Sequence, residues 1–187
     1  MTSHHHRTMA GCGCTGIAAP HGRRNFLRLA GLGAGAALMG LAPRLAIAGQ
    51  TDALLLSCMD YRLVDDITRY MDGRGMANKY DHIILAGASL GAVTSKFPAW
   101  NQTFWEHLEV AIKLHHVHKV FVMDHRDCGA YRVVFNYDYA QDRSAERKIH
   151  AETLHALRTA IQQRHEEIKE VELLLMGLDG KVEQVEI

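Results

Sequence analysis

The chain lacks an excess of charge of either sign, and its first quarter lacks acidic residues altogether. Lysine plus arginine and aspartate plus glutamate both number 21 in 187 residues. Residues 1–48 hold five arginines and no acid, so the rest of the chain carries a net charge of −5. This mildly acidic remainder argues against nucleic acid as a partner, because phosphate binding needs a basic face. Apolar residues make up 48% and charged residues 22%, which excludes a disordered or collagen-like chain.

Long hydrophobic runs are also missing. The apolar run at the front is residues 29–42, and its 14 residues are too short and too rich in glycine for a comfortable membrane span. It follows the basic segment 22–28 and precedes Ala46-Ile47-Ala48, a small-x-small cleavage site. This order is typical of a signal peptide, and the pair Arg23-Arg24 followed by Asn-Phe-Leu resembles a twin-arginine signal. An uncleaved anchor or an N-terminal soluble helix is the alternative.

We therefore expect residues 1–48 to be a twin-arginine-type signal peptide and residues 49–187 to be one compact domain. The resemblance implies periplasmic or other exported localisation, with no stable membrane span after cleavage. The twin-arginine route carries folded proteins, which suggests that a metal or cofactor is installed before export.

The body of the chain alternates short apolar runs with segments of helical spacing. The runs are near-continuous, as in a parallel sheet that is covered on both faces. The expected strands are 53–57, 82–86, 119–123 and 171–176, and the expected helices are 63–71, 100–116 and 145–168. A turn signal at 178–181 predicts that 182–187 returns as a short antiparallel strand. The sequence thus predicts a single α/β domain with a mainly parallel sheet of four to five strands and helices on both faces.

Cysteine is scarce, and only Cys58 and Cys128 remain after residue 48. Each directly follows an expected strand, and His125 stands three residues before Cys128. Ligands bind at the carboxyl ends of the strands in an open α/β sheet. Two thiols and one imidazole there have the number and type of ligands of a zinc site with an open fourth position.

These motifs carry a family resemblance. Cys58-x-Asp60-x-Arg62, followed much later by His125-x-x-Cys128-Gly, resembles the β-class carbonic anhydrases. The resemblance spans residues 54–182 and implies Zn²⁺ as cofactor, held by Cys58, His125 and Cys128. It implies Asp60 and Arg62 as the catalytic dyad, carbon dioxide and bicarbonate as the small-molecule substrate, and a homodimer or higher homo-oligomer.

The sequence departs from this family at several positions. Asp124 stands where the family has glycine before the histidine, and Ala130 replaces the second glycine after the cysteine. Ile84 and Leu85 occupy the arginine and asparagine positions after the second strand. Relatives on this scaffold hydrolyse carbon disulfide or carbonyl sulfide, so the fold and the metal do not fix the substrate.

The expected chemistry is the hydration of carbon dioxide to bicarbonate. Zinc lowers the pKa of a bound water toward about 7, and thiolate ligands should blunt this effect. Asp60 has two possible tasks: it can be the fourth ligand in a closed site, or it can pair with the planar guanidinium of Arg62 and accept a hydrogen bond from the nucleophile. The sequence does not single out a proton shuttle.

Three other interpretations are weaker or remain open. A Cys58–Cys128 disulfide would explain neither His125 nor the Asp60–Arg62 spacing. A cysteine phosphatase needs Cys-x5-Arg, whereas both cysteines here have arginine four positions on. A non-catalytic zinc protein on the same scaffold remains the alternative from another functional class.

Overall fold

The computed structural model describes residues 51–186, so the predicted signal peptide lies outside the described residues. The described elements are, in chain order, β1 (Ala53–Cys58), η1 (Tyr61–Leu63), α2 (Val64–Gly73), β2 (Tyr80–Leu85), α3 (Ser89–Val93), α4 (Pro98–His115), β3 (Lys119–His125), α5 (Gly129–Phe135), η2 (Tyr139–Gln141), α6 (Arg143–Arg164), β4 (Glu170–Met176) and β5 (Val182–Gln184). None of these helices has both the length and the apolar character that crossing a bilayer requires.

The strands form one sheet in the order β2-β1-β3-β4-β5. The first four strands are parallel, and β5 pairs with β4 in the antiparallel sense. The predicted α/β domain with a mainly parallel sheet is therefore confirmed, including the antiparallel return at the end of the chain.

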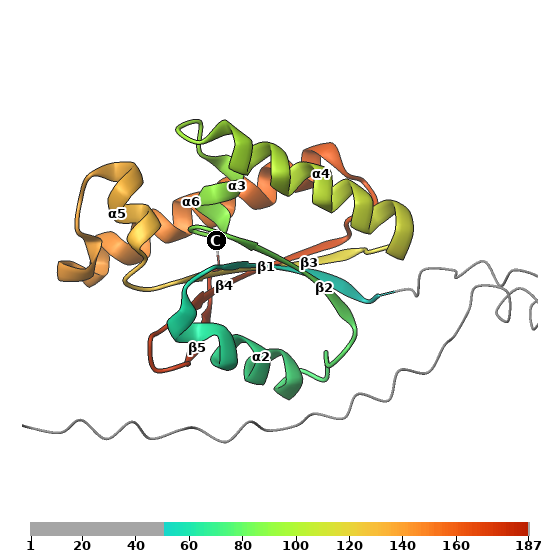
Figure 1. Cartoon of the computed structure of the whole chain (residues 1–187), viewed down its shortest axis with the longest axis horizontal. Coiled ribbons are helices and arrows are strands. Elements are labelled where there is room, and N and C mark those ends of the chain that lie inside the picture. The colour runs from blue at the N-terminus through green and yellow to red at the C-terminus, as the bar shows by residue number, and fades with distance from the viewer. Residues whose placement is uncertain (1–50, 187) are drawn as a thin grey trace, which may run out of the picture. The chain divides into compact units, whose positions relative to one another are not determined.

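Helices cover both faces of the sheet (Figure 1). Helices α3, α4 and α6 lie on one face, and α2 lies on the other. The chain moves from β1 to β2 in one direction along the sheet and from β2 past β1 to β3 in the other. Because parallel crossovers are right-handed, this reversal places α2 and α4 on opposite faces.

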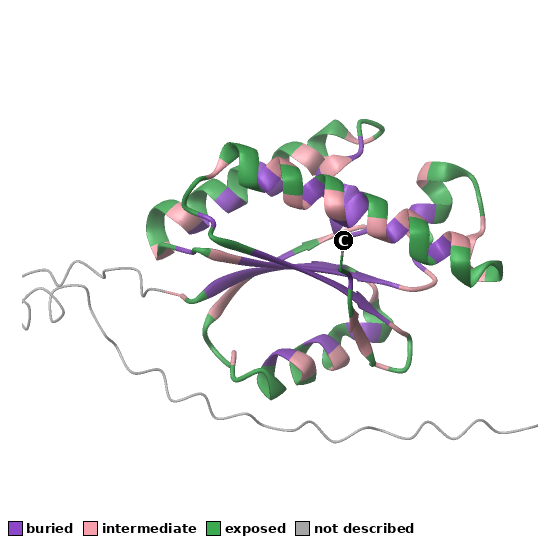
Figure 2. Ribbon diagram, turned by 180° about the vertical axis from the view of Figure 1, so that it is seen from behind, coloured by how far each residue is buried: buried purple, intermediate pink, exposed green. Residues whose placement is uncertain are grey.

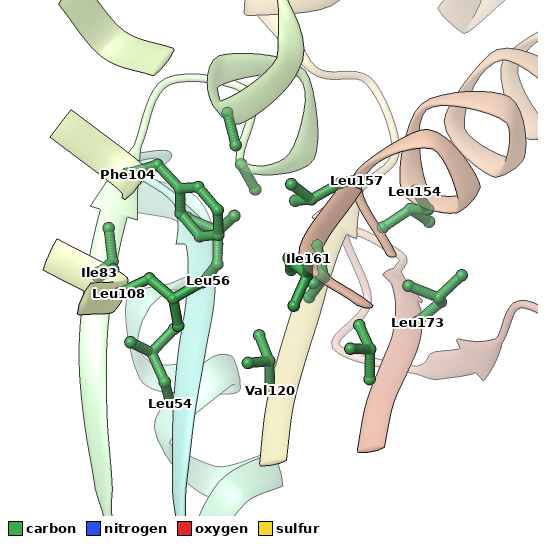
Figure 3. Packing of buried hydrophobic residues seen from close by; sticks show 14 of the residues in the cluster. Leu54, Leu56, Ile83, Phe104, Leu108, Val120, Leu154, Leu157, Ile161 and Leu173 are labelled. Atoms are coloured by element: carbon green, nitrogen blue, oxygen red, sulfur yellow. The ribbon is translucent and has the colours of Figure 1, made fainter. Parts of the chain in front are cut away.

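The central strands β1, β3 and β4 are mostly apolar because both of their faces are buried along nearly their whole length (Figure 2). Leu54 and Leu56 point toward α4 and α6, where they join Phe104 and Leu157 in the larger cluster (Figure 3). The alternate residue Leu55 points to the α2 side. Burying each leucine contributes about 1.5–3 kcal/mol, so the two clusters together hold the helices on the sheet.

Two short helices, α3 and α5, were not predicted from the sequence. Within the glycine-rich segment at residues 87–91, α3 begins at Ser89. A β-carbon at Gly91 would lie 2.7 Å from the carbonyl oxygen of Ala86, so α3 packs too closely against the preceding strand end for any other residue. Helices this short have little stability of their own and depend on such tertiary packing.

The strand order creates one special position between β1 and β3. These strands are neighbours, but the chain leaves them toward opposite sides of the sheet. Ser57 of β1 pairs with Met123 of β3, so both strands end at the same edge. Such a switch point leaves a crevice at the carboxyl ends of the strands, where ligands bind in α/β sheets.

Candidate metal centre

Three side chains with metal-binding atoms converge at this switch point. Cys58 is the last residue of β1, His125 is the last of β3, and Cys128 is the N-cap residue of α5. One ligand atom from each lies within 4.8 Å of the others, and all three residues are buried. The structure thus brings together the three residues that the sequence analysis expected to bind zinc.

The spacing of the two sulfur atoms suits a zinc ion. The Sγ atoms of Cys58 and Cys128 are 3.9 Å apart, and both cysteines are free thiols. In a tetrahedral site with Zn–S distances of about 2.3 Å, two sulfur ligands lie about 3.8 Å apart. The pair therefore has the separation of two ligands of one ion, and it is not a disulfide in this structure.

His125 is oriented for the same task. Its Nδ1 lies 2.8 Å from the carbonyl oxygen of Arg126 and must donate to it, because a carbonyl only accepts. In the neutral imidazole the lone pair is then on Nε2, which is buried and has no hydrogen-bond partner among the described residues. A buried nitrogen without a partner is costly, whereas a metal-binding histidine has this arrangement of one held and one open nitrogen. The donor set fits Zn²⁺.

The two thiols differ in their surroundings. The hydrogen bond between the two sulfur atoms, together with His125 and the backbone N–H of Gly87, lowers the pKa of Cys58 to about 4 despite its burial. The same contact and burial raise the pKa of Cys128. Cys58 therefore gives up its proton more readily than Cys128, and both would bind a metal ion as thiolates.

Asp60 and Arg62 stand at the mouth of this site. The Arg62 guanidinium binds both carboxylate oxygens of Asp60, at 2.9 Å through Nε and 2.7 Å through Nη2. These bonds lower the pKa of Asp60. Asp60 Oδ2 lies 3.7 Å from Nε2 of His125. The carboxylate is therefore beside the metal position and is turned toward the arginine.

Sequence reasoning missed a third member of this ion-pair group, Asp127. Its carboxylate accepts from Arg62 Nη1 at 2.9 Å, and its carbonyl oxygen accepts from Nη2 at 3.0 Å. Its place between His125 and Cys128 was the only signal in the sequence, and nothing there indicated a contact with Arg62.

Sequence reasoning also missed a buried cluster around Asp124, the residue at the family's glycine position. The Asp124 carboxylate accepts from the backbone N–H and hydroxyl of Ser89, the hydroxyl of Tyr131 and Nδ1 of His150, at 2.6–2.9 Å. A full set of partners explains how a carboxylate is accommodated in the core. It also connects the start of α3 to α5, the helix that follows the loop between His125 and Cys128.

The site opens into a cleft of about 570 Å³. Its wall combines Asp60, Arg62 and Cys128 with apolar side chains, which are Met59, Tyr61, Ala86, Trp100 and Val133. Tyr61 and Met59 are 86% and 66% exposed, so the apolar wall continues onto the surface. The cleft offers a small uncharged substrate an apolar approach to the metal position.

The histidines at 115, 116 and 118 lie at the end of α4 and just before β3. His115 ends α4, His116 caps it in the left-handed conformation, and His118 precedes β3. His115 pairs with Asp81 at 2.6 Å. In the part of the chain that the structure describes, only Cys58, His125 and Cys128 form a group of metal-binding side chains.

Comparison with known proteins places this geometry in a family. The family model described as "Putative carbonic anhydrase" matches residues 48–186. An "Uncharacterized protein RC0076" of Rickettsia conorii is 34% identical over 136 residues, which is 73% of each chain. A protein of Rickettsia bellii is also 34% identical, over 73% of this chain and 82% of its own.

Solved structures resemble the chain more distantly. The carbonic anhydrase from Glaciozyma antarctica has a TM-score of 0.46 at 16% identity, covering 87% of this chain and 94% of its own. A tetrameric β-carbonic anhydrase of Sordaria macrospora has a TM-score of 0.46 at 15% identity, covering 88% and 94%. Because the family model covers most of the chain, the chain belongs to the family described as "Putative carbonic anhydrase".

Proposed function

We propose that the protein is a zinc-dependent carbonic anhydrase that converts carbon dioxide and water reversibly to bicarbonate and a proton. The observation that carries the proposal is the triad Cys58, His125 and Cys128. The Asp60–Arg62 ion pair lies next to it and faces the cleft. Metal storage alone would need the triad and not the pair. Family membership supports the same reaction class.

Each residue then has a defined task. Cys58 and Cys128 supply two negative charges that balance Zn²⁺, and His125 is a neutral third ligand through Nε2. Zinc, when bound, supplies a Lewis acid that makes water nucleophilic near neutral pH. Arg62 holds the Asp60 carboxylate beside the metal position, where it can accept a hydrogen bond from the attacking water and orient it.

The apolar wall of the cleft has a separate task. Carbon dioxide is small, uncharged and weakly hydrated, so Met59, Tyr61 and Val133 can admit it without competing for hydrogen bonds. Bicarbonate is charged and is favoured in water, which helps product release. The same wall would admit carbon disulfide or carbonyl sulfide, so the substrate must be measured.

The decisive experiment is stopped-flow hydration of carbon dioxide by protein of known zinc content. Turnover that depends on zinc and is lost in Arg62→Ala supports the proposal. If the protein turned over only carbon disulfide or carbonyl sulfide, the proposed substrate would be wrong, while the proposed active site would stand. Stoichiometric zinc with no turnover of any of the three would favour the non-catalytic zinc protein.

We also infer that the enzyme is exported through a twin-arginine signal in residues 1–48 and acts as a homodimer or a higher homo-oligomer. The acid-free basic leader supports export. The exposed apolar side chains at the cleft mouth, Met59, Tyr61 and Val133, support self-association. Cell fractionation and sedimentation of the purified protein test the two points separately.

A further inference from the structure

Arg62 binds two carboxylates, and only one of them belongs to the predicted dyad. Nε and Nη2 bind Asp60, while Nη1 binds the Asp127 carboxylate at 2.9 Å and Nη2 also binds the Asp127 carbonyl at 3.0 Å. Without the two contacts to Asp127, only Asp60 would hold the guanidinium, which could then turn about its long side chain. Asp127 therefore fixes the side of the guanidinium that Asp60 does not reach.

The backbone of Asp127 is held in turn by Glu146 of α6. Its backbone has φ of 56°, a left-handed conformation that is uncommon outside glycine. Its N–H donates to a carboxylate oxygen of Glu146 on α6 at 2.5 Å. Glu146 is 1% exposed and is anchored by Arg126 and Arg143 at 3.2 and 3.1 Å. Unusual backbone conformations persist where the surroundings over-determine them, as these contacts do.

The orientation of Arg62 matters because the Asp60 carboxylate has two possible partners, Arg62 and a metal ion bound beside His125. Its Oδ2 lies only 3.7 Å from Nε2 of His125, so a small rotation would bring it onto the metal position. Arg62 competes for it, but Arg62 is one-third exposed, and a pair of this kind is weak when nothing holds the arginine. Arg132 is a weak competitor of Arg62 for Asp127, because it pairs more closely with Asp138, at 2.9 Å, than with Asp127, at 3.6 Å.

We propose that Asp127 is a positioning residue that locks Arg62 in the orientation that keeps Asp60 off the metal, so that the fourth coordination position stays open. The proposal rests on the proposed function for its effect on turnover, and on the geometry alone for its effect on coordination. Glu146 connects this arrangement to α6. It holds the backbone of Asp127 in place, Asp127 fixes the orientation of Arg62, and Arg62 fixes the orientation of the Asp60 carboxylate.

The test compares Asp127→Gly and Asp127→Asn with the wild type. Glycine accepts the left-handed backbone and removes the carboxylate, so backbone strain and the lost contact are separated. Asparagine tolerates the same backbone and keeps one acceptor oxygen. Asp138→Asn is the matched control, because Asp138 is a partly exposed carboxylate that pairs with Arg132 and not with Arg62.

The measurements are zinc content, X-ray absorption at the zinc edge and stopped-flow kinetics. We expect Asp127→Gly to keep zinc, to show a carboxylate as fourth ligand near neutral pH, and to lose about tenfold or more in kcat through misplacement of Asp60. Asp127→Asn should lie between Asp127→Gly and the wild type, and Asp138→Asn should match the wild type.

An unchanged fourth ligand in Asp127→Gly would overturn the proposal. The loss of zinc from a folded variant would also overturn it, because Asp127 would then stabilise the zinc ligands and not the orientation of Arg62. If Asp127→Gly does not fold, the coordination of Asp127→Asn decides in the same way. If the wild type binds zinc without hydrating carbon dioxide, the proposed function fails, while the change in coordination still tests the role of Asp127.

Discussion

At the scale of single residues, His125 links folding to metal binding. Its buried Nε2 has no partner among the described residues, and a metal ion would relieve that cost. We expect about one zinc per chain, from the three-ligand count, and a rise in Tm when zinc binds. Replacing Cys58, His125 or Cys128 by alanine should remove most of the zinc, as measured by elemental analysis.

His107→Ala is the matched control for this prediction. His107 is exposed on α4 and bonds only to the carbonyl of Thr103 within its own helix. It should keep the full zinc content. A Cys128→Ala protein with unchanged zinc would show that the ligand assignment is wrong.

The two members of the dyad should fail in different ways. Arg62→Ala removes the group that holds Asp60 at 2.7 Å, so the carboxylate can become the fourth zinc ligand and close the site. Asp60→Ala leaves the position to solvent and removes only the orientation of the nucleophile. Both variants should keep zinc and lose most activity, and X-ray absorption should show a carboxylate ligand in the first and none in the second.

The wild type should also be more active on the alkaline side of neutrality, because two thiolates weaken the effect of zinc on the pKa of water. An Arg62→Ala protein with wild-type hydration and an unchanged pH profile would contradict the dyad mechanism.

The sequence indicated the members of the site that local spacing defines. Cys58, Asp60 and Arg62 follow one strand directly, and His125 and Cys128 follow another, so the strand pattern was enough to bring them to one edge. Asp127 and Glu146 could not be found in this way. Their contact depends on a left-handed backbone at one position and on how α6 packs against a loop nineteen residues earlier.

At the scale of elements, an ion-pair group ties α2 to the sheet. Arg74, which caps α2, donates to the Glu172 carboxylate of β4 at 2.5 and 3.0 Å, and Lys119 of β3 donates at 3.0 Å. Burial alone would raise the pKa of Glu172, but these hydrogen bonds lower it below its usual value. The unfolded chain therefore binds more protons, and this contribution to stability is lost as the pH falls through the folded-state pKa.

Glu172→Gln should accordingly lower the free energy of unfolding by about 1–2 kcal/mol near neutral pH. The difference from the wild type should shrink on acidification to about pH 4 or below, where the wild-type carboxylate also takes up a proton. Urea unfolding at several pH values measures both effects. Asp179→Asn, which breaks an exposed pair with Lys181, should have no measurable effect, and a difference for Glu172→Gln that does not depend on pH would contradict the ion-pair argument.

Strands were easier to predict than short helices, for a physical reason. Strands β1, β3 and β4 are buried on both faces, so each contains an uninterrupted run of apolar residues, and their ends were found within a few residues. Helix α3 has five residues, four of them buried, and no polar face to give it a helical period. Its existence depends on contacts with α4 and α6 that local sequence does not encode.

At the scale of the whole molecule, the chain combines a basic, acid-free front with an acidic enzyme-like body. Residues 1–48 carry five arginines, and the remainder carries the five-charge acidic excess. If the front is an address and not a structural part, its effect should depend on the chemistry of two side chains and not on total charge. The guanidinium and the ammonium carry the same charge but differ in shape and in the number of donors.

Arg23→Lys combined with Arg24→Lys tests this distinction, because it keeps the charge of the leader and removes the arginine pair. We expect the variant to stay in the cytoplasm, as measured by cell fractionation, with zinc content and activity unchanged. The matched control, Arg7→Lys with Arg44→Lys, makes the same exchange outside the pair and should be exported normally. Periplasmic delivery of the paired variant would instead indicate an ordinary Sec signal, and retention of both double variants in the membrane fraction would indicate an anchor, because neither of those depends on which basic side chain precedes the apolar run.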